Sequence, residues 1–600
     1  MSLSLCMIAK NEEENIGRAL ESVKDIVDEM IVVDTGSTDS TVKIAESYGA
    51  KVYYYEWNNN FSDAKNFALE KAAGDWILLM DADDELVRED KQKLLDLLKN
   101  ADYDVYFMDT LSFVGDRPGN DIVMNINVRL IRNGKGIKFS GAIHEQIGPG
   151  SGGTVEDLKM RSERIRFNHY GYLNKNVVDK NKRRRNIEIL EKELENDNNN
   201  GFLLFGMGNE YFALHNFEKA LEYYNKAYEN FKPDLGYSPK LIIRMVMTLH
   251  ELKKYDEELD MIEKGLKYFP DFTDLEYLRA CLFHRLGRYT LAIKSLEKCI
   301  NLGEPKSYLN FIVGVGTFKP YHALAEIYFD MGDYQEAYNC CIKCLKIKPD
   351  FYPCFEKIAQ IYFKADDRNK EMDYIKRQLE SLFNGNLDGP AYLTLGDVFF
   401  SHGRYDIAYD YIIKAGEFLE ETETISFYKG MCLFHMRNYR EALKYFKKVK
   451  SGEFYEKALY KMVMCEVFEN KMNAAENLLN KAKEFTNDRV RHVYKTFKSL
   501  VEGKMCKTIS SDRVESTVYL NIICDLLNTL LKVSEFEIFE KSLQLLNLIE
   551  SDEVLLRLAK IYYVNGFQEM AFKEFIRSIK VFDKIDIEGL DMMKKIVLKV

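Results

Sequence analysis

Beyond residue 200, the sequence repeats one spacing of aromatic and small residues. An aromatic residue is followed three positions later by alanine or a substitute, and apolar or small residues follow four and seven positions after that. Where the pattern is regular, neighbouring units lie about 34 residues apart, the length of one helix-turn-helix repeat. The anchor pairs are Phe217/Ala220, Tyr255/Glu258, Tyr289/Ala292, Tyr334/Ala337, Tyr405/Ala408, Tyr439/Ala442 and Met472/Ala475. Such units cannot bury their apolar faces alone, so they are predicted to stack into an all-α solenoid with a concave surface.

The spacing is that of the tetratricopeptide repeat, and it is interrupted in a few places. After Ala292 the pattern is delayed by the segment GEPKSYLNFIVGVGTFKP, and a degenerate unit falls near Glu371. Residues 486–560 are helical in pattern but lack the repeat, which reappears near Phe567. We therefore predict regular repeats over residues 201–485 and a helical C-terminal region, with one degenerate repeat, over residues 486–600.

Composition narrows the class of protein. With 46% apolar residues the chain can bury a large core, and its net charge of −11 disfavours broad nucleic-acid binding, which needs a basic face. No apolar run approaches the roughly 18 residues of a membrane span, and the first residues lack a secretory pattern. The eleven cysteines are scattered; Cys341 and Cys344 fall on packing positions of their repeat, where we expect core thiols rather than half of a zinc site. These features predict a cytoplasmic location with reduced thiols.

Up to about residue 170, short apolar strands alternate with helices. The strand at 30–33 runs into Asp34, and the strand at 76–80 runs into the sequence DADDE. A further strand is expected at 51–55 and a helix at 64–73. Strands and helices in alternation predict an α/β domain with a mostly parallel sheet covered on both faces. Ligands of such sheets bind beyond the carboxyl ends of the strands, where both acidic segments lie.

Asp81 and Asp83 follow a buried strand with one residue between them. Carboxylates in this arrangement suit a hard divalent cation, Mg²⁺ or Mn²⁺, together with substrate phosphates. The alternative is an acidic turn that only ends the strand. Asp34, at the end of an adjacent strand, favours the metal site.

Three stretches together resemble one family: SLCMIAKNEEENIGRALES, MIVVDTGSTDST and AKNFALEKAAGDWILLMDADDE. They are similar to nucleotide-sugar-dependent family 2 glycosyltransferases, which have the Rossmann-like GT-A fold. The chain resembles more closely the bacterial branch in which tetratricopeptide repeats follow this domain, a branch that includes peptide S-glycosyltransferases. The resemblance implies a transferase domain at 1–172 and a connecting helix at 173–200, before the repeats.

The resemblance also assigns roles to residues of the donor site. Ile8, Ala9 and Lys10 would line the nucleotide pocket, with Asp34 on the base or ribose. The other positions carried over are Lys65 and Asn66 beside the donor, Asp81 and Asp83 as the D-x-D motif, and Asp83 as the direct metal ligand. Family members often have a second acid where this chain has Thr35, so the choice of nucleotide stays open.

By the same resemblance, Glu145 in FSGAIHEQI occupies the position of the catalytic base, which takes the acceptor proton during an inverting displacement. The alternative is a salt-bridged surface glutamate. His169 falls where many such enzymes place a histidine on the metal, although a core histidine would look alike. Arg129 and Arg132 either contact donor phosphate or pair with local acids. The basic run at 180–185 is either a solvated helix face or a contact to phosphate or acceptor.

These expectations define a function. The chain is predicted to be a metal-dependent inverting glycosyltransferase, using Mn²⁺ or Mg²⁺, that moves a sugar from a UDP-sugar to a hydroxyl or thiol. The expected acceptor is a peptide or protein held by the repeats. Two alternatives stay open: transfer to a lipid-linked or cell-envelope glycan, and a tetratricopeptide scaffold with an inactive transferase domain.

Overall fold

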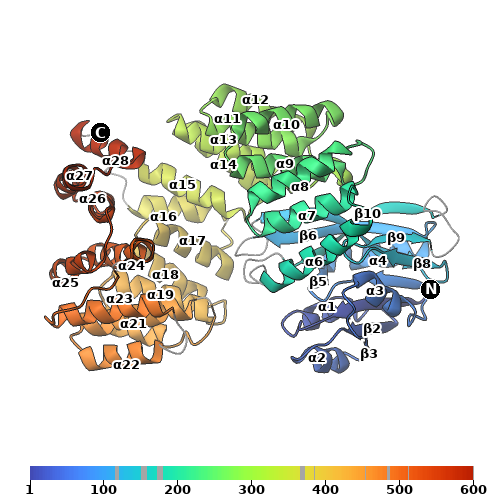
Figure 1. Cartoon of the computed structure of the whole chain (residues 1–600), viewed down its shortest axis with the longest axis horizontal. Coiled ribbons are helices and arrows are strands. Elements are labelled where there is room, and N and C mark those ends of the chain that lie inside the picture. The colour runs from blue at the N-terminus through green and yellow to red at the C-terminus, as the bar shows by residue number, and fades with distance from the viewer. Residues whose placement is uncertain are drawn as a thin grey trace. The chain divides into compact units, whose positions relative to one another are not determined.

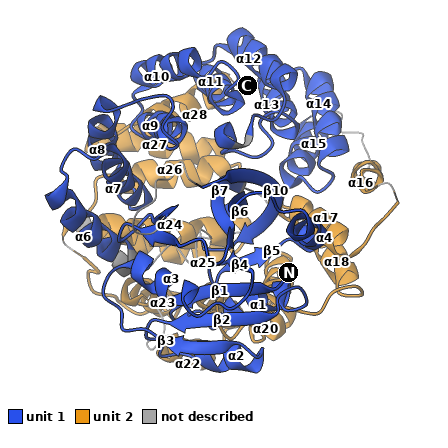
Figure 2. Ribbon diagram, turned by 90° about the vertical axis from the view of Figure 1, so that its right-hand side faces the viewer, with its two compact units in different colours: residues 1–366 blue, residues 367–600 orange. Residues whose placement is uncertain are grey.

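The computed structural model of the chain forms two compact units, residues 1–366 and 367–600 (Figures 1 and 2). Each unit is described by itself. The described residues are 1–114, 121–149, 158–171, 180–364, 372–383, 385–452, 454–482, 487–510 and 512–598. Within these ranges, no helix is both long enough and apolar enough to cross a bilayer.

The first unit begins with an α/β domain built on one large sheet. Its strand order is β3-β2-β1-β4-β7-β6-β10-β5, and β8 and β9 form a separate pair. The strands are β1 (Leu3–Ala9), β2 (Glu29–Asp34), β3 (Lys51–Tyr54), β4 (Trp76–Leu79), β5 (Asp84–Leu86), β6 (Val105–Val114), β7 (Asp121–Arg132), β8 (Ile137–Ser140), β9 (Gln146–Pro149) and β10 (Met160–His169). The helices of this domain include α1 (Ile16–Val23), α2 (Thr41–Ser47), α3 (Phe61–Leu69) and α4 (Lys91–Lys99).

One half of the sheet, β3-β2-β1-β4, is parallel throughout, as predicted. The four residues of β4 are all buried, which fits a strand covered by helices on both faces. Helix α3 starts earlier than the predicted 64–73, because the Asn60 side chain caps it by accepting a hydrogen bond from the Asp63 amide at 3.2 Å. The helix also ends earlier, at Leu69.

The other half of the sheet is mixed. Strand β7 is antiparallel to β4 and β6, β10 is parallel to β6, and β5 is antiparallel to β10. The prediction of a mostly parallel sheet is therefore wrong for this half. Val114 pairs with Asp121, so only residues 115–120 connect β6 to β7, and a connection that short permits antiparallel pairing but no parallel crossover.

Helix pairs follow the α/β domain, and the predicted repeat is confirmed. Each anchor is the first residue of the second helix of a pair, and the residue three positions later is at most 2% exposed. Cys341 and Cys344 are fully buried core thiols, as predicted. In the first unit the helices are α6 (Lys180–Asn196), α7 (Gly201–Ala213), α8 (Phe217–Glu229), α9 (Ser238–Glu251), α10 (Tyr255–Tyr268), α11 (Thr273–Arg285), α12 (Tyr289–Leu302), α13 (Phe318–Asp330), α14 (Tyr334–Ile347) and α15 (Tyr352–Lys364).

The second unit is helical throughout its described part. The position of the degenerate repeat, Glu371, lies outside the described residues, and α16 begins directly after it. The helices are α16 (Met372–Ser381), α17 (Gly389–Ser401), α18 (Tyr405–Ala415), α19 (Glu423–His435), α20 (Tyr439–Phe446), α21 (Tyr455–Phe468), α22 (Met472–Ala482), α23 (Asp488–Val501), α24 (Arg513–Lys532), α25 (Phe536–Ser542), α26 (Val554–Val564), α27 (Gln568–Phe582) and α28 (Ile587–Leu598).

The insertion between α12 and α13 joins the repeats to the sheet. Strand β4 pairs with β7 only at Leu130–Arg132, and the insertion pairs with β7 near its other end. There the Met124 amide donates to the Phe311 carbonyl at 3.0 Å. On the repeat side, the buried Asp274 carboxylate accepts hydrogen bonds from the amides of Phe311 and Ile312, at 2.9 and 2.7 Å. The delay in the repeat pattern is thus a segment that extends the pairing of β7.

Candidate active site

The ends of β1 and β2 form the expected edge of the sheet. Ala9 pairs with Asp34 in parallel register, and Ile8 is half-buried beside them. The Asp34 carboxylate, 4% exposed, accepts hydrogen bonds from the amides of Gly36 and Ser37 at 3.1 Å and so closes the turn after β2. Thr35 is also buried, and its hydroxyl donates to the Ala9 carbonyl at 3.3 Å. The threonine that departs from the family pattern thus ties the two strand ends together.

Lys10 follows β1 on the same edge, and its side chain is exposed. A Cβ placed on Gly36, which has a φ of +104°, would lie 4.0 Å from the Lys10 ammonium. The Lys10 side chain therefore extends over the turn that Asp34 closes. The structure thus brings together Ile8, Ala9, Lys10 and Asp34 at one edge of the sheet.

A possible metal-binding group lies beyond β4. Among the described residues, Asp83, Asp84 and His169 offer ligand atoms that all lie within 4.8 Å of one another. The His169 Nδ1 atom is 3.0 Å from Asp84 Oδ1 and 3.4 Å from Asp83 Oδ1. Asp81 is half-buried on the same turn, where its amide donates to the Asp84 carboxylate at 2.8 Å. Asp84, which the sequence interpretation passes over, is the central residue of this group.

The Asp84 carboxylate is fully buried and ion-paired with Arg129. Arg129 is itself 3% exposed and also donates to the Thr110 hydroxyl at 2.9 Å. Burial alone would raise the pKa of Asp84, but the Arg129 guanidinium and His169 hold that pKa well below its usual range. Of the two roles left open for Arg129, the structure therefore contains the ion pair with an acid. Arg132, three residues further along β7, stacks on Trp76, with 4.5 Å from the guanidinium carbon to the ring centroid.

His169 joins this group from another strand of the sheet. It is the last residue of β10, and it pairs in register with Asp84 of β5. Burial lowers the pKa of its imidazole, but Asp83 and Asp84 outweigh that effect and raise the pKa to about 9. The register between β10 and β5 therefore fixes a histidine and a carboxylate 85 residues apart in sequence.

Gly171 keeps space open over the ligand atoms. A Cβ there would lie 2.4 Å from Asp83 Oδ2 and 2.8 Å from His169 Nε2, so no other residue fits without displacing one of them. The carboxylate oxygen and the imidazole nitrogen therefore border a space that a side chain would fill. Ligands of these two kinds are compatible with Mn²⁺ or Mg²⁺. The residues present thus fit the expected metal ion.

Glu145 lies in the loop between β8 and β9, which we call the base loop (residues 141–145). Its carboxylate forms an ion pair with the Lys65 ammonium at 3.1 Å, and the two side chains are 14% and 25% exposed. Burial lowers the pKa of Lys65, but the charges of Asp81 and Glu145 outweigh it, so the net pKa is raised. Lys65 therefore connects the D-x-D turn electrostatically to the base loop.

Helix α3 forms hydrogen bonds to β8 and to the base loop. The Asn66 amide donates to the Phe139 carbonyl at 2.9 Å and accepts from the Phe139 amide at 2.8 Å. The Ser62 hydroxyl donates to the Gly141 carbonyl at 2.6 Å, and the Phe61 amide donates to the Ala142 carbonyl at 2.8 Å. Both the nitrogen and the oxygen of the Asn66 side-chain amide thus form hydrogen bonds to β8.

Helix α7 of the first repeat supports the base loop from the other side. His144, adjacent to Glu145, is packed so closely against α7 that a Cβ on Gly206 would lie 3.0 Å from its Cδ2 atom. The Phe202 ring also contacts His144 edge to face, at a centroid distance of 6.4 Å. Burial lowers the pKa of His144, so this ring packs as a neutral side chain. The base loop therefore rests on a repeat helix as well as on the transferase domain.

The basic run on α6 is divided between two environments. Arg183 pairs with the buried Glu210 of α7 at 3.1 Å, and Arg185 lies 5.2 Å from the Phe61 ring centroid. Arg184 is exposed and pairs with Glu188 of its own helix at 3.3 Å. The side chains of Lys180 and Lys182 lie outside the described residues. Arg183 and Arg185 thus fix α6 against α7 and α3.

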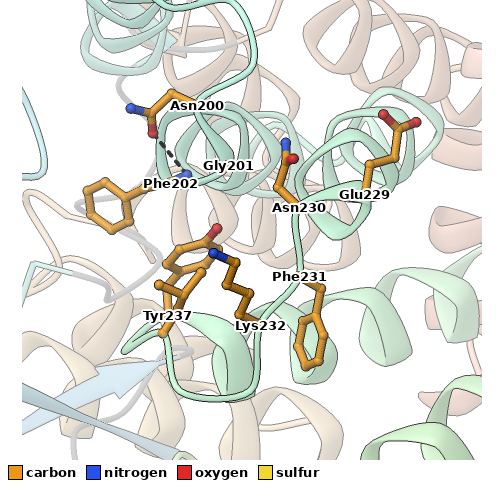
Figure 3. Close-up of a pocket in the computed structure, with 9 residues that line it drawn as sticks. Asn200, Gly201, Phe202, Glu229, Asn230, Phe231, Lys232 and Tyr237 are labelled. Carbon is orange, nitrogen blue, oxygen red and sulfur yellow. Dashed lines mark hydrogen bonds between the residues drawn. The ribbon is translucent and has the colours of Figure 1, made fainter.

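A cavity of about 510 Å³ lies next to the base loop, in the first repeat (Figure 3). Asn200 caps α7 at its edge by accepting a hydrogen bond from the Phe202 amide at 3.1 Å. The Phe202 ring contacts Tyr237 of the cavity, at 5.7 Å, as well as His144. Phe202 thus connects the cavity wall to the residue next to Glu145.

Polar side chains on β6 and β7 extend the site toward the repeats; we call them the polar strip (Thr110, Ser112, Asn125 and Asn127). Asn127 donates to the Thr110 hydroxyl and Asn125 to the Ser112 hydroxyl, each at 3.2 Å. Lys240 of α9 donates to the Asn125 carbonyl oxygen. The sequence interpretation missed these residues. The polar alternation Asn125, Asn127, Arg129 along one face of β7 is the signal that could have revealed them.

Comparisons with known proteins bear on both parts of the chain. Residues 4–156 match the model of glycosyl transferase family 2, and residues 201–234, 277–302 and 318–351 match tetratricopeptide repeat models. The expected combination of a family 2 glycosyltransferase domain with tetratricopeptide repeats is thereby confirmed.

The names of the curated relatives refer either to tetratricopeptide repeats or to glycosyltransferases. A TPR repeat-containing protein of Synechococcus elongatus, Synpcc7942_0270, is 29% identical over 44% of this chain and 66% of its own length. The SPbeta prophage-derived glycosyltransferase SunS of Bacillus subtilis is 28% identical over 46% of this chain and 65% of its own. An uncharacterized glycosyltransferase of Rickettsia felis is 45% identical over 17% of this chain and 36% of its own. The chain thus spans just under two thirds of the length of the first two relatives.

Proposed function

We propose that the chain is a metal-dependent inverting glycosyltransferase that moves a sugar from a UDP-sugar to a hydroxyl or thiol of a peptide or protein in the cytoplasm. One observation carries this proposal. Lys65 pairs with Glu145 at 3.1 Å, and the charge of Asp81 also favours the protonated form of Lys65. A candidate base therefore lies beside the acidic turn that follows β4. The match of residues 4–156 to glycosyl transferase family 2 supports the reaction class.

In this proposal the sheet edge binds the donor. Ile8, Ala9, Lys10 and Asp34 contact the nucleoside, while Asp83 and His169 hold Mn²⁺ or Mg²⁺. When bound, the metal ion neutralises the diphosphate that leaves with the nucleotide. Asp81 lies between this site and Lys65. Arg129 acts through Asp84, because its guanidinium is committed to that buried carboxylate.

Glu145 carries out the proton transfer. The acceptor oxygen or sulfur attacks the anomeric carbon while Glu145 takes the acceptor proton, and the bond from that carbon to the diphosphate oxygen breaks. The new bond forms on the face opposite the leaving nucleotide, so the anomeric configuration inverts. Lys65 orients Glu145 before the acceptor enters.

The repeats supply the acceptor site in this proposal. Helix α7 packs against His144 of the base loop, and the insertion after α12 pairs with β7, so the first repeats border the place where an acceptor must enter. Solenoids of this kind bind extended segments on their concave faces. We place the end of the transferase domain near residue 172 and that of the regular repeats near residue 485.

Two assays with purified protein and Mn²⁺ test the function. Hydrolysis of UDP-sugars should be lost in Asp83→Ala and persist in Glu89→Gln, a control at an exposed acid. Mass spectrometry of host peptides and proteins, with and without the chain, should reveal a hexose or N-acetylhexosamine increment. A sugar increment on envelope glycans alone would contradict the peptide acceptor. If the chain neither hydrolyses UDP-sugars nor binds nucleotide, the result would support the alternative of a repeat scaffold with an inactive transferase domain.

A further inference from the structure

Two cations on helix α9 have no acidic partner in the described part of the chain. Lys240 donates only to the neutral Asn125 side chain of β7, and the Arg244 guanidinium lies 4.8 Å from the Phe212 ring centroid. Two lysines on later repeat helices, α12 and α15, differ. Lys298 pairs with Glu276 and Lys357 with Glu326, each at 2.9 Å. The α9 pair is therefore an uncompensated positive charge on the repeats.

The positive charges of Lys240 and Arg244 repel one another. Lys240 and Arg244 are four residues apart, one helical turn, so their side chains share a face of α9. Burial lowers the pKa of Lys240, and the Arg244 charge lowers it further, to about 7. A neighbouring anion would relieve both effects, because it would stabilise the charged form of Lys240 and offset the repulsion.

The pair lies at one end of the polar strip. Asn125, which accepts from Lys240, donates in turn to Ser112, and along the same strands Thr110 is shared by Asn127 and Arg129. Lys240 is also close enough to the base loop for its charge to lower the pKa of His144, the neighbour of Glu145. An anion bound to α9 would therefore lie near the base and along the polar strip.

We propose that Lys240 and Arg244 bind a carboxylate of the acceptor, so that the enzyme prefers peptide segments with an acidic residue close to the modified hydroxyl or thiol. This inference rests on the proposed function. A guanidinium and an ammonium on one face match a carboxylate through charge-assisted hydrogen bonds. The hydroxyl and amide groups of the polar strip suit the uncharged peptide backbone, which both donates and accepts hydrogen bonds.

The test uses the full chain and two short synthetic peptides. Both contain a central serine and a central cysteine, and they differ only in the flanking residue, which is aspartate in one peptide and asparagine in the other. Fluorescence anisotropy at low salt should give tighter binding of the aspartate peptide, by roughly tenfold or more, the effect of one charge-assisted contact. In Lys240→Gln/Arg244→Gln this preference should disappear. In the matched control Lys264→Gln/Lys267→Gln, which removes the same charge from exposed positions of α10, it should remain.

Equal binding of both peptides by the unchanged protein would overturn the inference, as would a preference that survives the double substitution. Because Lys240 is half-buried, Arg244→Gln alone serves as a milder variant, expected to lose part of the preference. UDP-sugar hydrolysis, measured in parallel, separates the two proposals. Hydrolysis without the aspartate preference would refute only the carboxylate site, and the preference without hydrolysis would refute only the transferase.

Discussion

The two halves of the large sheet contribute to the site in different ways. In the parallel half, β3-β2-β1-β4, the site residues lie at the ends of the strands or in the turns after them, as Asp34 does at the end of β2 and Asp83 after β4. In the mixed half, they lie on the strands, as Arg129 does on β7 and His169 on β10. Side chains in the turns can face a ligand, whereas those on the strands are paired with one another. Substitutions in the first half should therefore impair function, and those in the second half should also impair folding.

The largest effect is expected for Arg129→Met. It removes the guanidinium that pairs with the fully buried Asp84, and breaking one partner of a buried ion pair costs about 3 to 5 kcal/mol. Urea unfolding measures this loss. Arg132→Met is the matched control on the same strand, because that side chain is 32% exposed, and the control should lose about 1 kcal/mol or less. Equal losses would mean that the buried ion pair with Asp84 does not stabilise the mixed half.

Asp83→Asn tests the parallel half. The side chain keeps its size but loses the charge that would hold a metal ion, so transfer should fall roughly 10²- to 10³-fold, as when a group stabilising the leaving charge is removed. The free energy of unfolding should fall by about 1 kcal/mol, less than for Arg129→Met, because the side chain loses its charge pair with His169 at 3.4 Å. Isothermal calorimetry with Mn²⁺ should show weakened binding. Full metal affinity in this variant would remove Asp83 from the metal site.

Asp274 tests how the insertion supports β7. Burial raises the pKa of this carboxyl from 3.8 to about 7, against the opposing effect of the Phe311 and Ile312 amides. The unfolded chain therefore releases this proton first, and stability should fall as pH rises from about 4 to about 7. Asp274→Asn keeps the Oδ1 acceptor for both amides and does not titrate. Its stability relative to the unchanged protein should rise over this interval by about 2 to 4 kcal/mol.

Thermal unfolding of both proteins at several pH values in that interval measures the difference. Parallel pH profiles would show that Asp274 is ionised in the fold.

The smallest effect is expected for Gly206→Ala. The added Cβ meets His144 at 3.0 Å and must shift the base loop by a few tenths of an ångström. Stability should stay within about 1 kcal/mol, because alanine favours the helix, while kcat should fall severalfold with donor binding unchanged. Gly236→Ala, where a Cβ meets nothing within 4 Å, is the control. An unchanged kcat would mean that α7 does not position the base loop.

The contrast between the halves also explains what the sequence could predict. The repeats and the parallel strands depend on local periodicity, so each anchor residue and each apolar run could be read directly. Asp34, Asp81 and Asp83 were found because they follow such runs. Asp84 was not, because its role depends on β5 pairing with β10 and on Arg129 arriving from β7. Lys240 was missed for a similar reason: its partner Asn125 is 115 residues away in sequence.

The insertion after α12 determines where this chain can be cut and rejoined. Its pairing with β7, held by Asp274, makes the first repeats part of the support of the catalytic sheet. A chimaera joined at residue 200 would discard that pairing together with the α7 surface that packs against His144. A chimaera joined after α14 would keep both. If the repeats bind the acceptor as proposed, exchange of acceptor specificity by grafting should therefore start from the later junction.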